Sequence, residues 1–324
     1  MNNLERDNPV TYLVGQGKGH PDHAGQRPLL GNSIRSQVWL RRGLLRPAWV
    51  ALCGALASGG LALRAEPLLQ FALLIFLVDV VWGGLWAALA ATDWATALRQ
   101  WQDWDHGSPV RFLPYTLSQG PAGRLARTCG HLQSWWKDLL QPTLGPTLVG
   151  LALLLPLALV VAGMLGARPF LLTLAAITLL QFVVAWSGGD ARPVPGTQAL
   201  FEIALPWLAG HAMFKELTAP SAALALAYAL TCAGGLRMAQ GWRGLTLWNL
   251  GQVAVVVVLL AGHQPQAAGI VGLLWIGQVL VQPGLFDVET EEVTPAAFAL
   301  YLRFSQPWLM AAMLVAAWGV RTAL

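Results

Sequence analysis

The sequence predicts an all-α, polytopic membrane protein, and two observations carry that prediction. Of the 324 residues, 56% are hydrophobic and only 11% are charged, whereas about a quarter of the residues in an ordinary soluble domain are charged. Apolar stretches recur along most of the chain, and a stretch of about 20 residues can cross a hydrocarbon core of roughly 30 Å as a helix. Helices are expected because they satisfy their own peptide groups in lipid.

Nine apolar segments are predicted as membrane spans. In chain order they cover residues 47–63, 67–91, 146–166, 169–187, 199–214, 219–236, 244–262, 266–285 and 306–322. The fifth segment is the weakest, because it contains Glu202, Pro206 and His211. We therefore expect it to be kinked or to line a polar cavity.

The distribution of Lys and Arg predicts the orientation of these spans. With nine spans, most basic residues fall on the side of the N-terminus, and only Arg64, Arg168, Lys215 and Arg321 fall on the other. Basic loops remain in the cytoplasm, so the N-terminus is expected there and the C-terminus on the opposite side. The enrichment of Lys and Arg in cytoplasmic loops also accounts for the formal charge of +4. No nucleic-acid partner is expected, because the basic residues are not gathered on one face.

Two segments are polar enough to lie outside the spans. Residues 1–44 are rich in Gly, Pro, Asn and Gln and are interpreted as a flexible cytoplasmic tail, which leaves residues 45–324 as the transmembrane helical domain. Residues 92–145 are predicted to form a long cytoplasmic loop, and a loop of that length usually is functional or contains its own helices. Its stretch GRLARTCGHLQSWWKDLL predicts a short helix along the membrane surface, because its apolar residues recur at helical spacing and include Trp.

Few residues inside the spans are capable of chemistry. Ionisable groups at membrane depth are costly and therefore functional candidates: Asp79 is expected either to pair with a neighbouring helix or to bind a ligand, and Glu202 to line a cavity. His211 is the only histidine well inside a span, which argues against a haem held by two histidines of this chain. Transporters are a poor match because no pair of broken, repeated half-spans is visible.

Three segments carry a family resemblance. The first span contains LLRPAWVALCGALASGG, the fifth contains ALPWLAGHAMFKEL, and the last contains LYLRFSQPWLMAAM. In the second of these, Leu205, Pro206, Trp207, Ala209, Gly210 and Phe214 match a family pattern. On these residues the chain resembles the UbiA-type intramembrane prenyltransferases, and within them the chlorophyll and bacteriochlorophyll synthases. The resemblance implies about nine helices around a central cavity, in the plasma (inner) membrane or a photosynthetic membrane.

The resemblance also implies a reaction. Such enzymes transfer a prenyl group from its diphosphate to a (bacterio)chlorophyllide or related ring acceptor, and aspartate-rich loops hold Mg²⁺. The first such loop falls on TDWATALRQ, which retains Asp93 and is followed by Asp103 and Asp105. These three aspartates are the predicted catalytic residues, with Asp93 and Asp103 as the predicted metal ligands.

The second loop and the cavity supply the remaining candidates. The second loop reads GGLRMAQGWRGL and contains no acidic residue. Diphosphate binding is expected from arginines, namely Arg111, Arg192, Arg237 and Arg243. The predicted cavity lining consists of Asp79, Glu202, Trp207 and His211.

The missing acidic residues keep an alternative open. A catalytically inactive paralogue would keep the cavity and bind pigment, quinone or isoprenoid as an assembly factor or subunit of a photosynthetic membrane complex. A transporter or scaffold with a chance resemblance is the third class. The expected partners are the lipid bilayer, an isoprenoid diphosphate and a tetrapyrrole or quinone-like ligand.

Overall fold

The chain folds into a bundle of helices that is suited to a membrane. The computed structural model describes residues 46–89, 92, 94, 120–137, 141–186, 194–240, 243–286 and 294–323. Every regular element within these residues is a helix, and six helices there are long and apolar enough to cross a membrane. The protein is therefore a multi-pass α-helical membrane protein, as the sequence predicts; the predicted tail, residues 1–44, lies outside the described residues.

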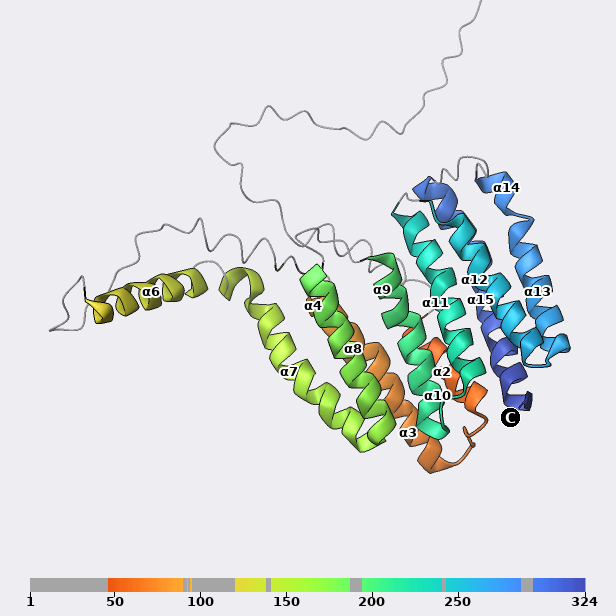
Figure 1. Ribbon diagram of the computed structural model, residues 1–324, viewed down its shortest axis with the longest axis horizontal. Coiled ribbons are helices and arrows are strands. Elements are labelled where there is room, and N and C mark those ends of the chain that lie inside the picture. The colour runs from red at the N-terminus through yellow and green to blue at the C-terminus, as the bar shows by residue number, and fades with distance from the viewer. Residues whose placement is uncertain are drawn as a thin grey trace, which may run out of the picture.

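The long helices of the bundle alternate in direction along the chain, and α6 lies across them (Figure 1). In chain order they are α2 (Pro47–Ser58), α3 (Ala65–Ile75), η2 (Phe76–Val81), α4 (Trp82–Leu89), α6 (Pro121–Trp135), α7 (Gln141–Leu165), α8 (Ala167–Trp186), α9 (Pro195–Ala199), η4 (Leu200–Ala204), α10 (Leu205–Phe214), α11 (Ala219–Ala239), α12 (Leu245–Ala261), α13 (Pro265–Val279), α14 (Gln282–Leu285) and α15 (Pro295–Ala323). The elements η2 and η4 are π-helical turns. Each is inserted into a longer helix, so that α3, η2 and α4 run on as one helix and α9, η4 and α10 as another.

Each predicted span overlaps a helix or a run of consecutive helical elements. Six of the described helices are long and apolar enough to cross a membrane, so the number of nine spans stays a prediction. Helix α2 has only 12 residues, or about 18 Å at 1.5 Å per residue, and it ends before residue 63 because Gly59 adopts φ 69° and caps it. Helix α12 has 17 residues and is likewise shorter than the six long apolar helices. The fifth predicted span widens into the π-helical turn η4 just before Pro206, a distortion expected where proline removes a backbone hydrogen bond.

The long predicted loop also contains a helix, as its sequence indicates. Helix α6 covers most of the predicted stretch 123–140, and α7 begins at Gln141, five residues before the predicted span. Trp135 near the end of α6 packs with Leu148 and Trp94 around the buried Leu144 of α7. This contact attaches α6 to the start of α7, and Figure 1 shows α6 extending away from the bundle, across the direction of the other helices.

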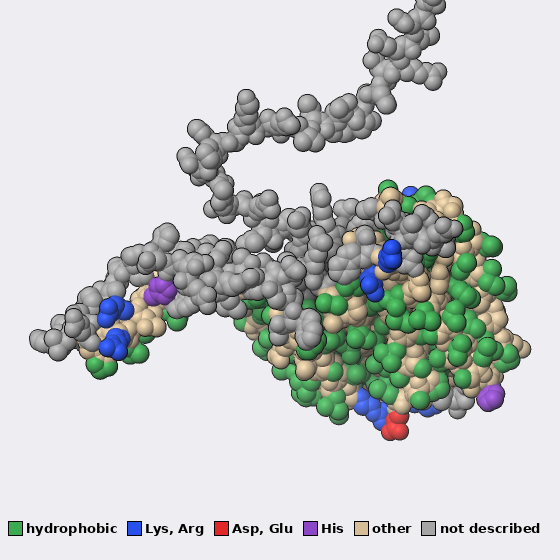
Figure 2. Space-filling view, turned by 45° about the horizontal axis from the view of Figure 1, so that its top comes forward, with side chains coloured by type: hydrophobic (Ala, Val, Ile, Leu, Met, Phe, Trp, Pro, Cys, Tyr) green, Lys and Arg blue, Asp and Glu red, His purple; other side chains and the backbone are tan. Residues whose placement is uncertain are grey.

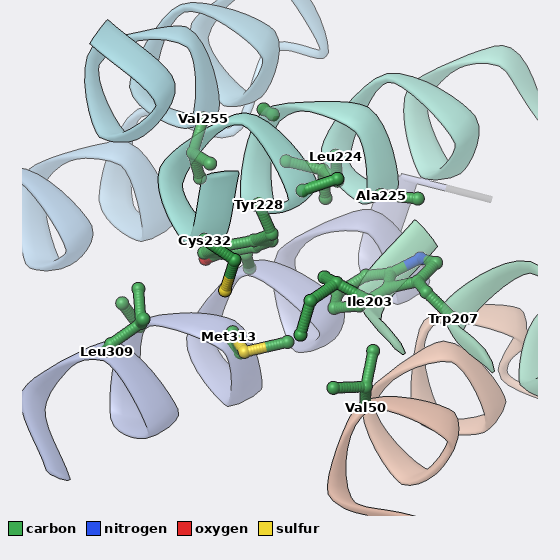
Figure 3. Packing of buried hydrophobic residues seen from close by; sticks show 14 of the residues in the cluster. Val50, Ile203, Trp207, Leu224, Ala225, Tyr228, Cys232, Val255, Leu309 and Met313 are labelled. Carbon is green, nitrogen blue, oxygen red and sulfur yellow. The ribbon is translucent and has the colours of Figure 1, made fainter. Parts of the chain in front are cut away.

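The interior consists of two groups of buried side chains that share α2 and the η4–α10 segment. One group packs α3, η2 and α4 against α7 and α8, and the other packs α11, α12, α13 and α15. Figure 3 shows the second group, where Tyr228, Cys232 and Met313 from α11 and α15 pack near Trp207 and Val50. The shared helices therefore join the two halves.

Small residues let the shared helices α2 and α10 approach closely. A Cβ atom on Gly54 would collide with the backbone carbonyl of Trp207, and one on Gly210 with the carbonyl of Ala51. Close backbone contact through glycine is the usual way in which helices associate in lipid, where burial of apolar surface supplies no driving force. These two glycines thus fix the centre of the fold.

Candidate functional site

Five of the predicted site residues lie outside the described residues. They are Asp93, Asp103, Asp105, Arg111 and Arg192. The helix ends that flank these loops are nevertheless described: α4 ends at Leu89, α8 at Trp186, and α9 begins at Pro195. In Figure 1 these ends lie at one end of the bundle, together with the end of α11 and the start of α12.

Arg237 and Arg243 stand at this same end. Arg237 lies in the last turn of α11 and Arg243 lies two residues before the start of α12, and both are exposed. The corner is tight: a Cβ on Gly244 would lie 3.1 Å from Cβ of Arg237. Within the described part of the chain neither arginine forms an ion pair, since the ion pair found there joins Arg168 and Glu216 at 2.7 Å.

The start of α12 adds to the positive character of this corner. Its N-cap residue is Gly244, whose lack of a side chain leaves the first-turn N–H groups without a side-chain cap. Uncapped N–H groups and the helix dipole favour an anion at such a position. We call this place the α11–α12 arginine corner (Arg237, Arg243 and Gly244); its two guanidinium groups are exposed, whereas Gly244 is buried against α11.

Trp207 and His211 have no exposed surface, and their polar atoms are hydrogen-bonded. Trp207 Nε1 donates to Ser221 Oγ at 3.0 Å, and Ser221 Oγ lies 3.0 Å from His211 Nδ1. His211 Nε2 lies 3.0 Å from the carbonyl oxygen of Glu216. A carbonyl only accepts, so Nε2 carries the proton, and a neutral imidazole then accepts the Ser221 hydroxyl proton at Nδ1. The chain of bonds is complete and links α10 to α11.

Asp79 and Glu202 both lie on π-helical turns and both are half-buried. Glu202 accepts a hydrogen bond from Gln198 Nε2 at 3.1 Å. Its neighbour Phe201 contacts the rings of Trp82 and Trp86, with centroid distances of 6.1 and 4.9 Å, which brings η4 against the helix that carries Asp79. The sequence identified the two acids, but not the π-helical turns, which often occur at functional sites.

A ladder of side-chain amides escaped the sequence reasoning. Gln252 of α12 and Gln278 of α13 exchange hydrogen bonds in both directions, at 3.3 and 3.0 Å. Asn249 and Gln282 do the same at 3.0 Å each, and Gln282 Nε2 also donates to the hydroxyl of Tyr301 at 2.9 Å. The signal was present: these amides sit one helical turn apart within each span. The ladder locks α12, α13, α14 and α15 together.

No metal centre is formed by the side chains that the structure describes. Groups of three or more His, Cys, Asp or Glu residues are absent from those ranges, and Cys53, Cys129 and Cys232 are free. The predicted Mg²⁺ ligands Asp93 and Asp103 fall outside the described ranges. The Mg²⁺ site therefore stays a prediction.

Comparisons with known proteins returned nothing for this chain: no family model, no curated protein and no solved structure matches it.

Proposed function

We propose that this chain is a UbiA-type membrane prenyltransferase of the chlorophyll-synthase branch. It would transfer a prenyl group from its diphosphate to a (bacterio)chlorophyllide or related ring acceptor, in the plasma (inner) membrane or a photosynthetic membrane. The proposal includes nine spans around a central cavity, with the N-terminus in the cytoplasm and the C-terminus on the opposite side. The resemblance and the arrangement of the helix ends support this proposal.

The observation that carries the proposal is the common end of the helices. The loops that contain Asp93 and Arg192 start from helices that end at the same end of the bundle as the α11–α12 arginine corner. A prenyl diphosphate has an anionic head and an apolar tail, so it needs cations at the membrane surface and an apolar path into the bilayer. The exposed guanidinium groups of Arg237 and Arg243 suit the head, and the surrounding spans suit the tail.

The proposed reaction breaks the bond between the allylic carbon and the diphosphate oxygen, and the electron pair leaves with the diphosphate. A carboxylate oxygen of the acceptor then forms an ester bond with that carbon. Arg237 and Arg243 hold the diphosphate and compensate the negative charge that grows on it as the bond breaks. Mg²⁺ held by Asp93 and Asp103 would neutralise part of the same charge, and Asp105 completes the proposed acidic set.

One observation favours a second candidate, the catalytically inactive paralogue. The stretch from the last turn of α11 to the start of α12, residues 234–245, contains two arginines and no acidic residue, so it can hold an anion but offers no carboxylate to a second metal ion. Such a protein would retain an isoprenoid, quinone or tetrapyrrole and serve as an assembly factor or subunit of a photosynthetic membrane complex.

Binding and turnover separate these candidates. The detergent-purified protein is titrated with geranylgeranyl diphosphate and then assayed with chlorophyllide and Mg²⁺. We expect the double variant Arg237→Ala/Arg243→Ala to weaken diphosphate binding by about 10-fold or more, since a hydrogen bond to a charged group contributes roughly 1.5–3 kcal/mol. The control Arg64→Ala/Arg321→Ala removes two arginines at the other end of the bundle and is expected to leave binding unchanged.

The results of these two assays distinguish the enzyme from the inactive paralogue. Ester product that disappears in Asp93→Ala supports the enzyme, whereas binding that depends on Arg237 and Arg243 without product supports the inactive paralogue. Equal loss of binding in the double variant and its control would contradict both, because the arginine corner would then have no special role.

A further inference from the structure

Helix α6 has an exposed apolar face that the proposed function does not use. The face consists of Leu125, Cys129, Leu132 and Trp136 and is here called the α6 apolar face. These residues are spaced by four, three and four positions, which places them on one side of the helix. Leu125 is 69% exposed, Leu132 51% and Trp136 46%, and Cys129 is also exposed.

Basic residues accompany this face and acidic ones are missing from it. Arg124 and Lys137 flank the face at helical spacing, Arg127 lies on the opposite side of α6, and all three are exposed. Residues 120–137 contain no Asp or Glu. In Figure 2 the arm formed by α6 carries hydrophobic side chains along its lower edge with basic side chains beside them. Helices with an apolar face that includes Leu and Trp and with Lys and Arg beside it are typical of those that lie in the membrane interface.

The position of α6 relative to the long helices indicates that the bilayer covers the α6 apolar face. The contact of Trp135 with Leu144 and Leu148 fixes the end of α6 to the first turns of α7, one of the six long apolar helices. Figure 1 shows α6 running across the direction of those helices, at the end of the bundle where α4 ends and α9 begins. A helix that crosses the spans at their end lies parallel to the membrane plane, at headgroup depth.

We propose that α6 is an anionic-lipid-binding helix. Its apolar face enters the boundary between headgroups and acyl chains, and Arg124 and Lys137, which flank that face on its two sides, bind the phosphate groups of anionic phospholipids. Long basic side chains reach from a buried helix face to the headgroups, and attraction to an anionic leaflet increases with each Lys or Arg near the surface. This inference does not depend on prenyl transfer, since it rests on α6 alone.

Cys129 provides a native reporter for the test. Cys53 and Cys232 are buried in the bundle, so a nitroxide spin label reacts with the exposed Cys129 in the full-length protein. The protein is placed in nanodiscs of phosphatidylcholine alone or of an equal mixture with phosphatidylglycerol. Collisions of the label with oxygen, which concentrates in lipid, are compared with collisions with a water-soluble nickel complex.

We expect oxygen collisions to exceed nickel collisions at Cys129, and the excess to grow when phosphatidylglycerol is present. The matched control exchanges two residues of similar size, Cys129→Ser with Ser134→Cys, and moves the label to the opposite side of α6. There the nickel collisions are expected to exceed the oxygen collisions. The variant Arg124→Gln/Lys137→Gln is expected to remove the effect of phosphatidylglycerol.

Two results would overturn the proposal. Nickel collisions in excess at Cys129 in both lipid mixtures would place the apolar face in water. A label shielded from both reagents would mean that protein, and not lipid, covers this face.

Discussion

Replacing Ser221 by alanine removes one hydroxyl group that joins two buried side chains. Ser221 Oγ accepts a hydrogen bond from Trp207 Nε1 and lies within hydrogen-bonding distance of His211 Nδ1, and all three residues have no exposed surface. Hydrogen bonds between membrane helices contribute on average about 0.6 kcal/mol each, and a buried polar group that loses its partner costs about 1–3 kcal/mol. We therefore expect Ser221→Ala to lower the free energy of unfolding by about 1–3 kcal/mol.

Ser305 of α15 offers a matched control. It is as fully buried as Ser221, but its hydroxyl has no hydrogen-bond partner among the described residues. Ser305→Ala removes the same atom without leaving a partner unpaired. We expect it to leave stability unchanged or to raise it slightly, because an unpaired buried hydroxyl is itself unfavourable.

The assay is reversible unfolding of the purified protein in mixed micelles of mild detergent and dodecyl sulfate, followed by circular dichroism. The two alanine variants and the unchanged protein are measured side by side. If Ser221→Ala unfolds at the same dodecyl sulfate fraction as Ser305→Ala, the hydrogen bonds between α10 and α11 contribute nothing, and the reasoning from geometry to stability is wrong.

The remaining predictions use the same assay. Gln278→Leu leaves the buried amide of Gln252 without its partner and is expected to cost about 1–3 kcal/mol, whereas Gln252→Leu/Gln278→Leu recovers most of that loss; an additive double variant would argue against the ladder. Gly210→Ala places a Cβ against the carbonyl of Ala51 and is expected to cost about 1–3 kcal/mol through overpacking. Gly150→Ala, where a Cβ meets no atom within 4 Å, is its control and should not destabilise; equal effects of the two would contradict the close contact of α2 and α10.

The fold class could be predicted because the bilayer imposes a simple rule on sequence. Apolar length alone locates α7, α8 and α11, since a helix that crosses lipid must be apolar over most of its surface. The rule fails at helix ends. Helix α15 begins at Pro295, well before the predicted residue 306, because a helix continues into the polar surroundings where hydropathy no longer marks it.

The candidate site was only partly accessible from sequence. The positions of Arg237 and Arg243 beside one corner follow from the short segment between two spans, so sequence reasoning could place them together. Hydropathy could not reveal that Trp207 and His211 share Ser221, because residues ten or more apart meet only when two helices pack. The same holds for Gln252 and Gln278, whose amides face one another on different helices.

The sequence by itself determined that this is a helical membrane protein, where most of its spans lie and which residues inside them are costly to bury, because each of these properties depends on local composition. Only the tertiary structure decided how the helices associate: the contact of α2 and α10 through Gly54 and Gly210, the π-helical turns under Asp79 and Glu202, the amide ladder, and the direction in which α6 leaves the bundle. In a bilayer, an apolar side chain gains little when it moves from lipid into a contact between helices, because both surroundings are apolar. Helix association therefore depends on close backbone contact and a few polar pairs. Such pairings join residues distant in the chain, and no local pattern specifies them.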